Sequence, residues 1–454
     1  MKNSLRSTFL LLFCFFFLIC CTDKSLRDKD QDNQENSTLV LEDEALLDLV
    51  QQQTINYFWE AAETSSGMAR ERFHTDGEYP YHDKDIVTTG GTGFGLMAIL
   101  VGIERGFIPK AEGIARFRQI VSFLEEADRF HGAWPHWLYP DGRVYPFSSK
   151  DDGGDLVETA FLVQGLLTVK AYLDKNVPEE ATLSQRIQEL WEGVEWNWYT
   201  RGGESVLYWH WSPNFEWDMN FPIGGYNECL IAYVLAASSP TYPISKDAYD
   251  QGWARNGAIQ RDTLYYQLRT QVDHYEYDTA PVGPLFWAHY SYLGLSPRGL
   301  SDQYADYWTV NKNHALIHYR YCQDNPLSHK DYGPDEWGLT SSYSLNGYDA
   351  HRPGNDPGVI SPTAALSSMP YTPDASMAFL RKLYNQKDSL IGPYGPYDAY
   401  STGNNWYVPR YLAIDQGPIP VMIENYRTGM LWELFMTNSE VRLGLEKLGF
   451  SFTP

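Results

Sequence analysis

Three acidic residues beside an apolar segment are spaced so that their carboxyl groups could act together in catalysis. Asp151, Asp155 and Glu158 are four and three residues apart, so a helix that includes them places all three on one face. The residues that follow, 159–169, are mostly apolar, which predicts a helix buried on every side with carboxyl groups at its mouth. Asp155 and Glu158 also have the spacing of a capping box, a structural role that leaves Asp151 unexplained. We expect at least one of the three to act in catalysis.

Two more acidic residues occur where a helix is expected to begin. Glu228 precedes the apolar run 229–237, and burial against apolar groups favours a protonated carboxyl, the form that a general acid needs. Asp415 is followed by Pro418, and proline is common in the first turn of a helix. For both acids the alternative is a role in capping the helix.

Tryptophan, histidine and tyrosine alternate in loops that are rich in glycine and proline. The chain has 15 Trp, 33 Tyr and 21 Phe, and such rings suit stacking on a sugar as well as filling a core. We expect the tryptophans to form sugar-stacking platforms, and His136 and Arg410 to bind sugar hydroxyl groups. The expected substrate-binding residues are Trp134, His136, Trp137, Trp209, Trp211, Trp287 and Arg410.

The composition excludes several classes of function. Asp and Glu outnumber Lys and Arg by 58 to 35, which gives a net charge of −23, so nucleic acid is not an expected partner. The histidines are scattered and form no HExxH motif, so we expect no metal and no other cofactor. The segment 90–95 (GGTGFG) lacks the glycine spacing of nucleotide-binding loops, and close packing of helices explains its glycines better.

The first 42 residues indicate export and a lipid anchor. Lys2 and Arg6 precede an almost wholly apolar run over 9–19, which is typical of a signal peptide over residues 1–20. Cys21 lies in a lipobox-like context, so we expect a lipidated Cys21 on the outer membrane, followed by a flexible tether that ends at residue 42. An ordinary cleaved signal peptide is the alternative.

Residues 43–454 are expected to form one all-α domain. Helical runs alternate between amphipathic ones, such as 111–129, and ones that are apolar nearly all round, such as 156–169. An inner ring of buried helices inside an outer ring predicts an (α/α)6 barrel of about six helical hairpins with short strands in its mouth loops; a solenoid and a two-layer bundle are alternatives. Helices are expected to begin near Asp43, Thr92, Pro109, Asp155, Leu183, Gly225, Ile259, Ser301, Thr363, Asp374, Pro418 and Ser439.

Several long segments, in order, resemble one known family. It is the glucoamylase-like family of bacterial exported proteins, grouped as glycoside hydrolase family 144, and the resemblance runs from about residue 43 to the C-terminus. The segments include TTGGTGFGLMAI, HGAWPHW, DLVETAFL, GGYNECLIAYVLAASSP and AIDQGPIPVMIENYRTG. The resemblance implies an (α/α)6 barrel that hydrolyses β-1,2-glucan with inversion at the anomeric carbon.

The resemblance also implies which carboxyl groups act. Residues implicated in the family's activity correspond to Asp151, Asp155, Glu158, Glu228 and Asp415, all acidic here. An inverting hydrolase needs a general acid and a general base roughly 6.5–9.5 Å apart. We expect Glu228 to be the acid and Asp155 or Glu158 the base, with Asp151 or Asp415 as further alternatives.

Other functions remain possible from the sequence. The expected partner is a neutral glucan, bound by a monomer that acts as an endo- or exo-hydrolase. The alternatives are a glucoamylase-type hydrolase of α-glucans, a glycan-binding surface lipoprotein without catalysis, and a polysaccharide lyase. The acidic net charge and the scarcity of arginine in the mouth loops weigh against the lyase, which must hold a uronate.

Overall fold

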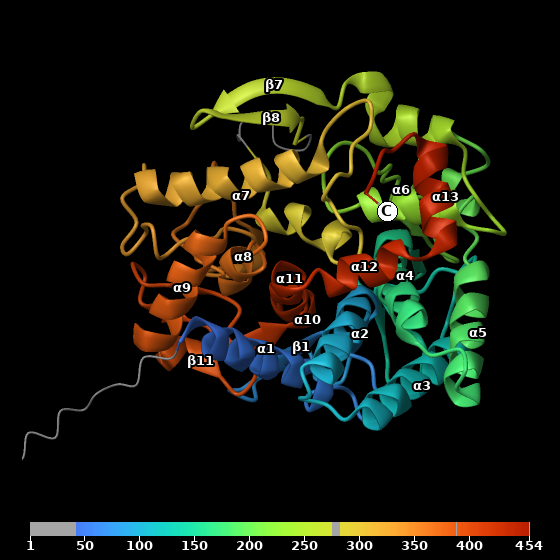
Figure 1. The fold of residues 1–454 in the computed structure, drawn as a ribbon, viewed down its shortest axis with the longest axis horizontal. Coiled ribbons are helices and arrows are strands. Elements are labelled where there is room, and N and C mark those ends of the chain that lie inside the picture. Colours follow the sequence, from blue (N-terminus) through green and yellow to red (C-terminus); the bar gives the residue numbers. More distant parts are fainter. Residues whose placement is uncertain (1–41, 275–281, 387, 454) are drawn as a thin grey trace, which may run out of the picture. The chain divides into compact units, whose positions relative to one another are not determined.

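The computed structural model describes residues 42–274, 282–386 and 388–453 (Figure 1). The predicted signal peptide, the lipidated Cys21 and nearly all of the predicted tether lie outside the described residues. Within the described part of the chain, no helix combines the length and the apolar character that crossing a membrane requires.

Helices dominate the described chain. Their bounds are α1 (Asp43–Trp59), α2 (Thr89–Glu104), α3 (Lys110–Glu126), α4 (Leu156–Tyr172), α5 (Pro178–Glu192), α6 (Leu230–Ser238), α7 (Tyr307–Asp324), α8 (Pro362–Leu366), α9 (Pro373–Gln386), α10 (Ala413–Gln416), α11 (Pro418–Arg427), α12 (Met430–Met436) and α13 (Ser439–Leu448). The predicted helical character is therefore confirmed.

The strands are short and pair antiparallel in separate small sheets. Most of these sheets lie in loops between helices, as the sequence predicted. The pairs are β1 (Arg72–His74) with β15 (Arg410–Leu412), β5 (Gly154–Asp155) with β6 (His210–Trp211), β7 (Gln260–Tyr265) with β8 (Leu268–Val272), β9 (Ser341–Ser344) with β10 (Gly347–Ala350), β11 (Ile391–Gly392) with β12 (Gly395–Pro396), β13 (Tyr400–Ser401) with β14 (Trp406–Tyr407), and the three-stranded set β2 (Val87–Thr88), β3 (Trp137–Leu138) and β4 (Val144–Tyr145).

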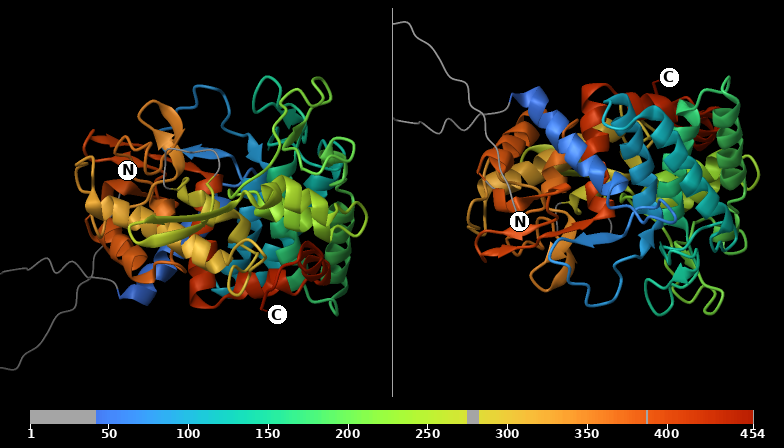
Figure 2. Two further views of the ribbon diagram at one scale, coloured as in Figure 1. Left: turned by 90° about the horizontal axis from the view of Figure 1, so that it is seen from above. Right: turned by 90° about the horizontal axis from the view of Figure 1, so that it is seen from below.

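Two kinds of helix are present, as the hydrophobic patterns predicted. All residues of α6, and nearly all of α2 and α4, are buried, whereas α3 and α5 bury only one face. In Figure 1, α3 and α5 run along the outside of α2 and α4. The loop between β1 and β2, and loops between β3 and β6, project from one side of the helical part (Figure 2).

The helices α2 and α4 touch through glycine. A Cβ atom added at Gly93 would lie 2.2 Å from the carbonyl oxygen of Phe161, and one added at Gly165 would lie 2.2 Å from that of Gly93. Backbone therefore packs against backbone at this crossing. The glycines that suggested close helix packing in the sequence serve this purpose.

The helix expected near Ile259 is wrong, because this segment forms the β7–β8 hairpin. Its turn residues Tyr266 and Gln267 both have positive φ, at 49° and 63°. A two-residue turn of this kind normally contains asparagine or glycine, so the sequence hid the hairpin. Two other helices begin later than expected, α6 at Leu230 and α7 at Tyr307.

The substitution Gly93→Ala tests the α2–α4 contact. We expect it to lower the free energy of unfolding by about 3 kcal/mol, because backbone atoms of α4 cannot give way. Alanine is otherwise favoured over glycine inside a helix by about 1 kcal/mol, so a loss reports the clash. Chemical denaturation measures it. The control is Gly333→Ala, where an added Cβ meets nothing within 4 Å; an equal effect of the two substitutions would contradict the contact.

Candidate active site

A cavity of about 340 Å³ collects several of the predicted site residues. Glu158 at the start of α4 and Glu228 just before α6 both line it. His136, Trp137 and Trp209 line it as well. The cavity therefore combines two carboxyl groups with aromatic walls, a composition that fits a small polar ligand with apolar faces.

Glu158 is fixed by a backbone group of the neighbouring helix. Its Oε2 accepts a hydrogen bond from the N–H of Gly90, in the first turn of α2, at 2.8 Å. A Cβ atom at position 90 would lie 2.4 Å from that oxygen, so only glycine leaves room for the bond. Burial raises the pKa of Glu158 to about 7, although the positive charge of His136 opposes the shift. Its proton is therefore exchangeable near neutral pH.

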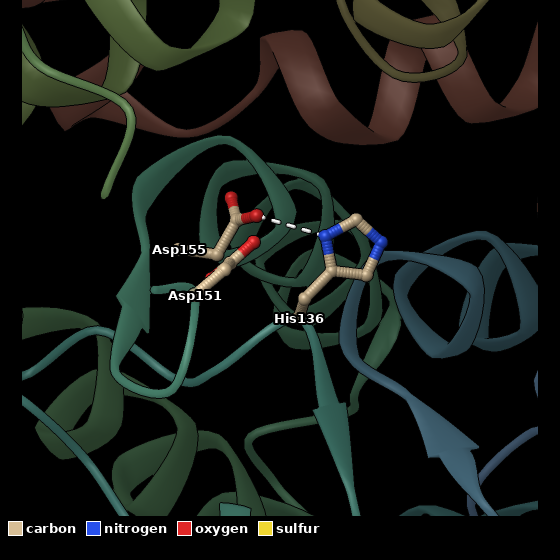
Figure 3. A group of neighbouring side chains, drawn as sticks. All are labelled: His136, Asp151 and Asp155. Carbon is tan, nitrogen blue, oxygen red and sulfur yellow. Dashed lines mark hydrogen bonds and ion pairs between the residues drawn. The ribbon is translucent and has the colours of Figure 1, made fainter. Parts of the chain in front are cut away.

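Asp155 caps α4 and orients His136 at the same time. Its Oδ1 accepts the N–H groups of Val157 and Glu158 at 3.0 and 2.9 Å, so the capping spacing seen in the sequence is real. Its Oδ2 accepts a hydrogen bond from Nδ1 of His136 at 2.9 Å (Figure 3). Burial alone would raise the pKa of Asp155, but the bond and charge of His136, the charge of His210 and the N–H of Glu158 together outweigh it and lower that pKa. The reciprocal half of the capping box is absent, because Glu158 binds Gly90 instead.

His136 lies between two carboxyl groups and carries a positive charge. Its Nε2 is 3.9 Å from Oε1 of Glu158, and its Nδ1 faces Asp155. Burial lowers the pKa of His136, but the charge of Glu158 and the bond to Asp155 overcome this and raise the pKa to about 10. Phe147 covers the imidazole at 4.1 Å between ring centroids. The ring is thus an imidazolium that holds the two carboxyl groups in place.

Asp151 adds a third carboxyl group beside Asp155. It is buried, and its Oδ1 is 3.4 Å from Nδ1 of His210. His136, Asp151 and Asp155 each offer one ligand atom within 4.8 Å of the others, so they are the group that could hold a metal ion. A cation there would have to break the hydrogen bond between His136 and Asp155. The expectation of no metal stays a prediction.

Glu228 and Asp415 take different positions. Glu228 lies two residues before α6 begins and lines the cavity. Asp415 is buried in α10 and does not line this cavity; its Oδ1 accepts the hydroxyl of Tyr290, which does, at 3.3 Å. Arg410, in β15, does not line the cavity either; it pairs with Asp76 at 3.0 Å and lies over the ring of Tyr343, a lining residue, 5.9 Å from its centroid.

The predicted tryptophans divide into wall and core. Trp137 and Trp209 line the cavity. Trp134 is completely buried, and its Nε1 donates to the carbonyl of Leu124 at 3.1 Å, so the expectation that it stacks on a sugar is wrong. Trp287 is 3% exposed and packs beside His274, outside the cavity wall, which corrects the same expectation.

Trp211 lies on the β6 strand next to His210 but packs away from the cavity. Its ring meets the ring of His131 edge-on, with centroids 4.8 Å apart, and also approaches Trp198. Side chains alternate along a strand, so His210 and Trp211 face opposite sides. Trp211 is therefore not among the residues that line the cavity.

Known proteins were compared with this chain. The family model described as "Putative glucoamylase" matches residues 220–439. An endo-β-1,2-glucanase from Chitinophaga pinensis, solved with sophorotriose and glucose, is 57% identical, with a TM-score of 0.89 over 90% of this chain and 99% of that one. An exo β-1,2-glucooligosaccharide sophorohydrolase (non-reducing end) from Parabacteroides distasonis is 42% identical over 95% of this chain.

The chain belongs to glycoside hydrolase family 144. It spans 62% of the length of the Parabacteroides distasonis sophorohydrolase. A solved β-1,2-glucanase from the same species is 43% identical, with a TM-score of 0.85, and the match covers 90% of this chain and 60% of that one. The relatives thus include an enzyme named as endo-acting and one named as exo-acting.

Sequence reasoning missed several residues that line the cavity of this family 144 chain. Glu71 and Arg72 lie at the start of β1, where no apolar helix follows to draw attention to them. Burial raises the pKa of Glu71, and the charge of Arg72 opposes the shift. Arg72 also lies over the ring of Trp137, 5.4 Å from its centroid. The acidic and basic neighbours in ERFH were the available signal, and backbone pairing with β15 and with Ile86 brings them to the cavity.

The substitution Asp155→Asn tests how the imidazolium is held. Asparagine keeps the helix cap, but it removes one of the three carboxyl charges that act on His136, so we expect the pKa of His136 to fall by about one to three units. NMR titration of the ring measures it. Because the folded pKa is raised, the ring's contribution to stability is complete below pH ~6.5 and is lost as the pH rises through about 10.

The matched control removes the carboxylate beside a different histidine. Glu195→Gln removes the carboxylate that lies 3.0 Å from Nδ1 of His131, outside the cavity, and the pKa of His136 is expected to stay unchanged. A wild-type His136 that titrates at the ordinary value for histidine would show that the charged arrangement is wrong.

Proposed function

We propose that this protein hydrolyses β-1,2-glucan and its sophorooligosaccharides by acid–base catalysis with inversion. The observation that carries the proposal is one cavity lined by both Glu158 and Glu228 and walled by Trp137 and Trp209. Its 57% identical relative is named an endo-β-1,2-glucanase and was solved with sophorotriose and glucose. The helical part is proposed to close into an (α/α)6 barrel whose mouth holds this cavity, and the protein to act as a monomer.

The two carboxyl groups receive different roles in this proposal. Glu228 protonates the glycosidic oxygen as general acid, and Glu158 activates a water molecule on the opposite face of the sugar as general base. A pKa of about 7 makes Glu158 a base poised near neutral pH. Asp155 and His136 position Glu158, and Asp151 supports them through His210.

The test is product analysis on two glucans. The purified protein is incubated with linear β-1,2-glucan and with soluble starch, and products are separated by chromatography. We expect sophorooligosaccharides from the first and none from the second. Glu228→Gln and Glu158→Gln should each lower kcat about 10²- to 10⁴-fold, because each removes one proton-transfer group. Release of glucose from starch would show that the substrate is an α-glucan and not β-1,2-glucan. If neither glucan gave a product, the result would favour a glycan-binding protein without catalysis.

The pH profile assigns the roles. With Glu158 as base, kcat/KM rises with pH through about 7, because the carboxylate must be ionised. A fall through the same pH would make Glu158 the acid instead. The leaving group of an activated aryl sophoroside departs without protonation. This substrate should therefore restore turnover in Glu228→Gln, which lacks the acid, and not in Glu158→Gln, which lacks the base.

We also propose that the protein is exported and anchored to the outer membrane through Cys21. The support is the sequence of residues 1–21 alone, with its basic start, apolar run and lipobox-like cysteine. Labelled palmitate should be incorporated into the wild-type protein in cells and not into Cys21→Ser, which should leave the membrane fraction. Equal labelling of both proteins would contradict the anchor.

A further inference from the structure

Two buried carboxyl groups lie behind the cavity wall and are not used in the proposed mechanism. Asp415 is in α10, and Asp398 lies between β12 and β13; they are 2% and 5% exposed. Both residues line the same small void, and each shifts the pKa of the other. The void beside them measures about 10 Å³, the lower limit for a single water molecule. The two groups are thus neighbours in a nearly dry site.

Each carboxyl group uses one oxygen to hold a residue of the cavity wall. Asp415 Oδ1 accepts the hydroxyl of Tyr290 at 3.3 Å, and Asp398 Oδ2 accepts the backbone N–H of Tyr343 at 2.7 Å. Both tyrosines line the cavity. The remaining oxygens, Asp398 Oδ1 and Asp415 Oδ2, are shielded from solvent and find no N–H or hydroxyl donor among the described residues. The partner that remains for each of these two oxygens is the other one.

A direct bond between two carboxyl groups requires a proton. An ionised carboxylate only accepts hydrogen bonds, and two adjacent buried carboxylates cannot both keep a negative charge. The cations of the neighbouring strands are committed to other acids. Arg410 in β15 pairs with Asp76 at 3.0 Å, and Arg72 in β1 pairs with Asp83 at 3.1 Å.

We propose that Asp398 and Asp415 share one proton, and that the bond made by this proton keeps Tyr290 and Tyr343 in the cavity wall. The proton replaces the cation that such a pair of acids would otherwise need. Asp398 becomes a positioning residue of the site, acting through Asp415 and the two tyrosines. Asp415 is then unsuited to be the general base.

The charges around the pair agree with a retained proton. Burial raises the pKa of Asp398 to about 6 and raises that of Asp415 well above its usual range. Glu71 acts on both as a further negative charge, and Tyr290 and Tyr348 face them as phenols. These groups add no positive charge to the pair, so one proton is expected to remain between pH 7 and 8.

The first experiment counts protons by comparing the full-length protein with the double variant D398N/D415N. Asparagine keeps the shape and removes both titrating groups. Urea unfolding is measured between pH 7 and 8, where unfolded aspartates hold no proton. A native pair that holds one proton makes the wild-type unfolding constant rise about tenfold per pH unit relative to the variant. Parallel profiles, meaning no proton, or a hundredfold rise, meaning two, would overturn the proposal.

A second measurement applies if the double variant does not fold. At pH 7.5 Glu158 is partly protonated as well, so the infrared spectrum of the single variant D415N is subtracted from that of the wild type. The difference spectrum is expected to show a protonated-carboxyl band of the pair. A difference spectrum without this band would overturn the shared proton. Neither measurement depends on the substrate. Inactivity on β-1,2-glucan would therefore contradict the proposed function without affecting the result for the shared proton.

Kinetics then test the positioning role, which rests on the proposed function. Asp398→Ala should raise KM for sophorooligosaccharides about tenfold with a smaller change in kcat, because Tyr343 loses its anchor. Asp398→Asn, whose amide oxygen still accepts the Tyr343 N–H, should restore KM. The matched control is Asp356→Ala: that acid holds the Tyr332 hydroxyl at 2.8 Å outside the cavity, and its loss should leave KM unchanged. Equal effects of the two alanine variants would overturn the positioning role.

Discussion

The contact between the backbones of α2 and α4 is the constraint on which the site depends. At Gly93 and Gly165 no side chain separates the two helices, so the crossing brings their first turns into register. Only at this distance does the N–H of Gly90 reach Glu158. A helix N-terminus favours a nearby carboxylate, so the same packing that completes the core also supplies a hydrogen bond at the site. Folding and chemistry are joined at one helix crossing.

The acids of the site have different surroundings, and these give them different properties. Asp155 accepts bonds from two backbone amides and an imidazolium, which keeps it ionised although it is fully buried. Glu158 has one amide and a more distant imidazolium, and its pKa lies near 7. Asp398 and Asp415 have only each other and groups of the tyrosines. Different numbers of hydrogen-bond donors thus turn chemically similar carboxyl groups into an ionised anchor, a group that exchanges its proton near neutral pH and, as proposed, a pair that shares one proton.

Local patterns in the sequence predicted the features that depend on local structure. The spacing of Asp155 and Glu158 predicted a cap, and the apolar runs predicted the buried helices α2, α4 and α6. The features that depend on distant contacts were not predictable. Trp134 and Trp137 lie in one loop and have similar neighbours, yet one fills the core and the other lines the cavity. Glu71, just before β1, is held beside the cavity partly by a bond from the N–H of Ala413, more than 330 residues later.

The side chains of the segment Trp134-Pro135-His136-Trp137 lie in different surroundings. Trp134 anchors in the helical core through Leu124, His136 binds Asp155, and Trp137 faces the cavity. The number of residues between these anchors is thereby fixed. An inserted or deleted residue would put a polar side chain in the core position of Trp134. We therefore expect this loop to tolerate substitutions but not changes of length. Packing in the core fixes the length of the loop, and only the side chains that face the cavity are free to change during evolution.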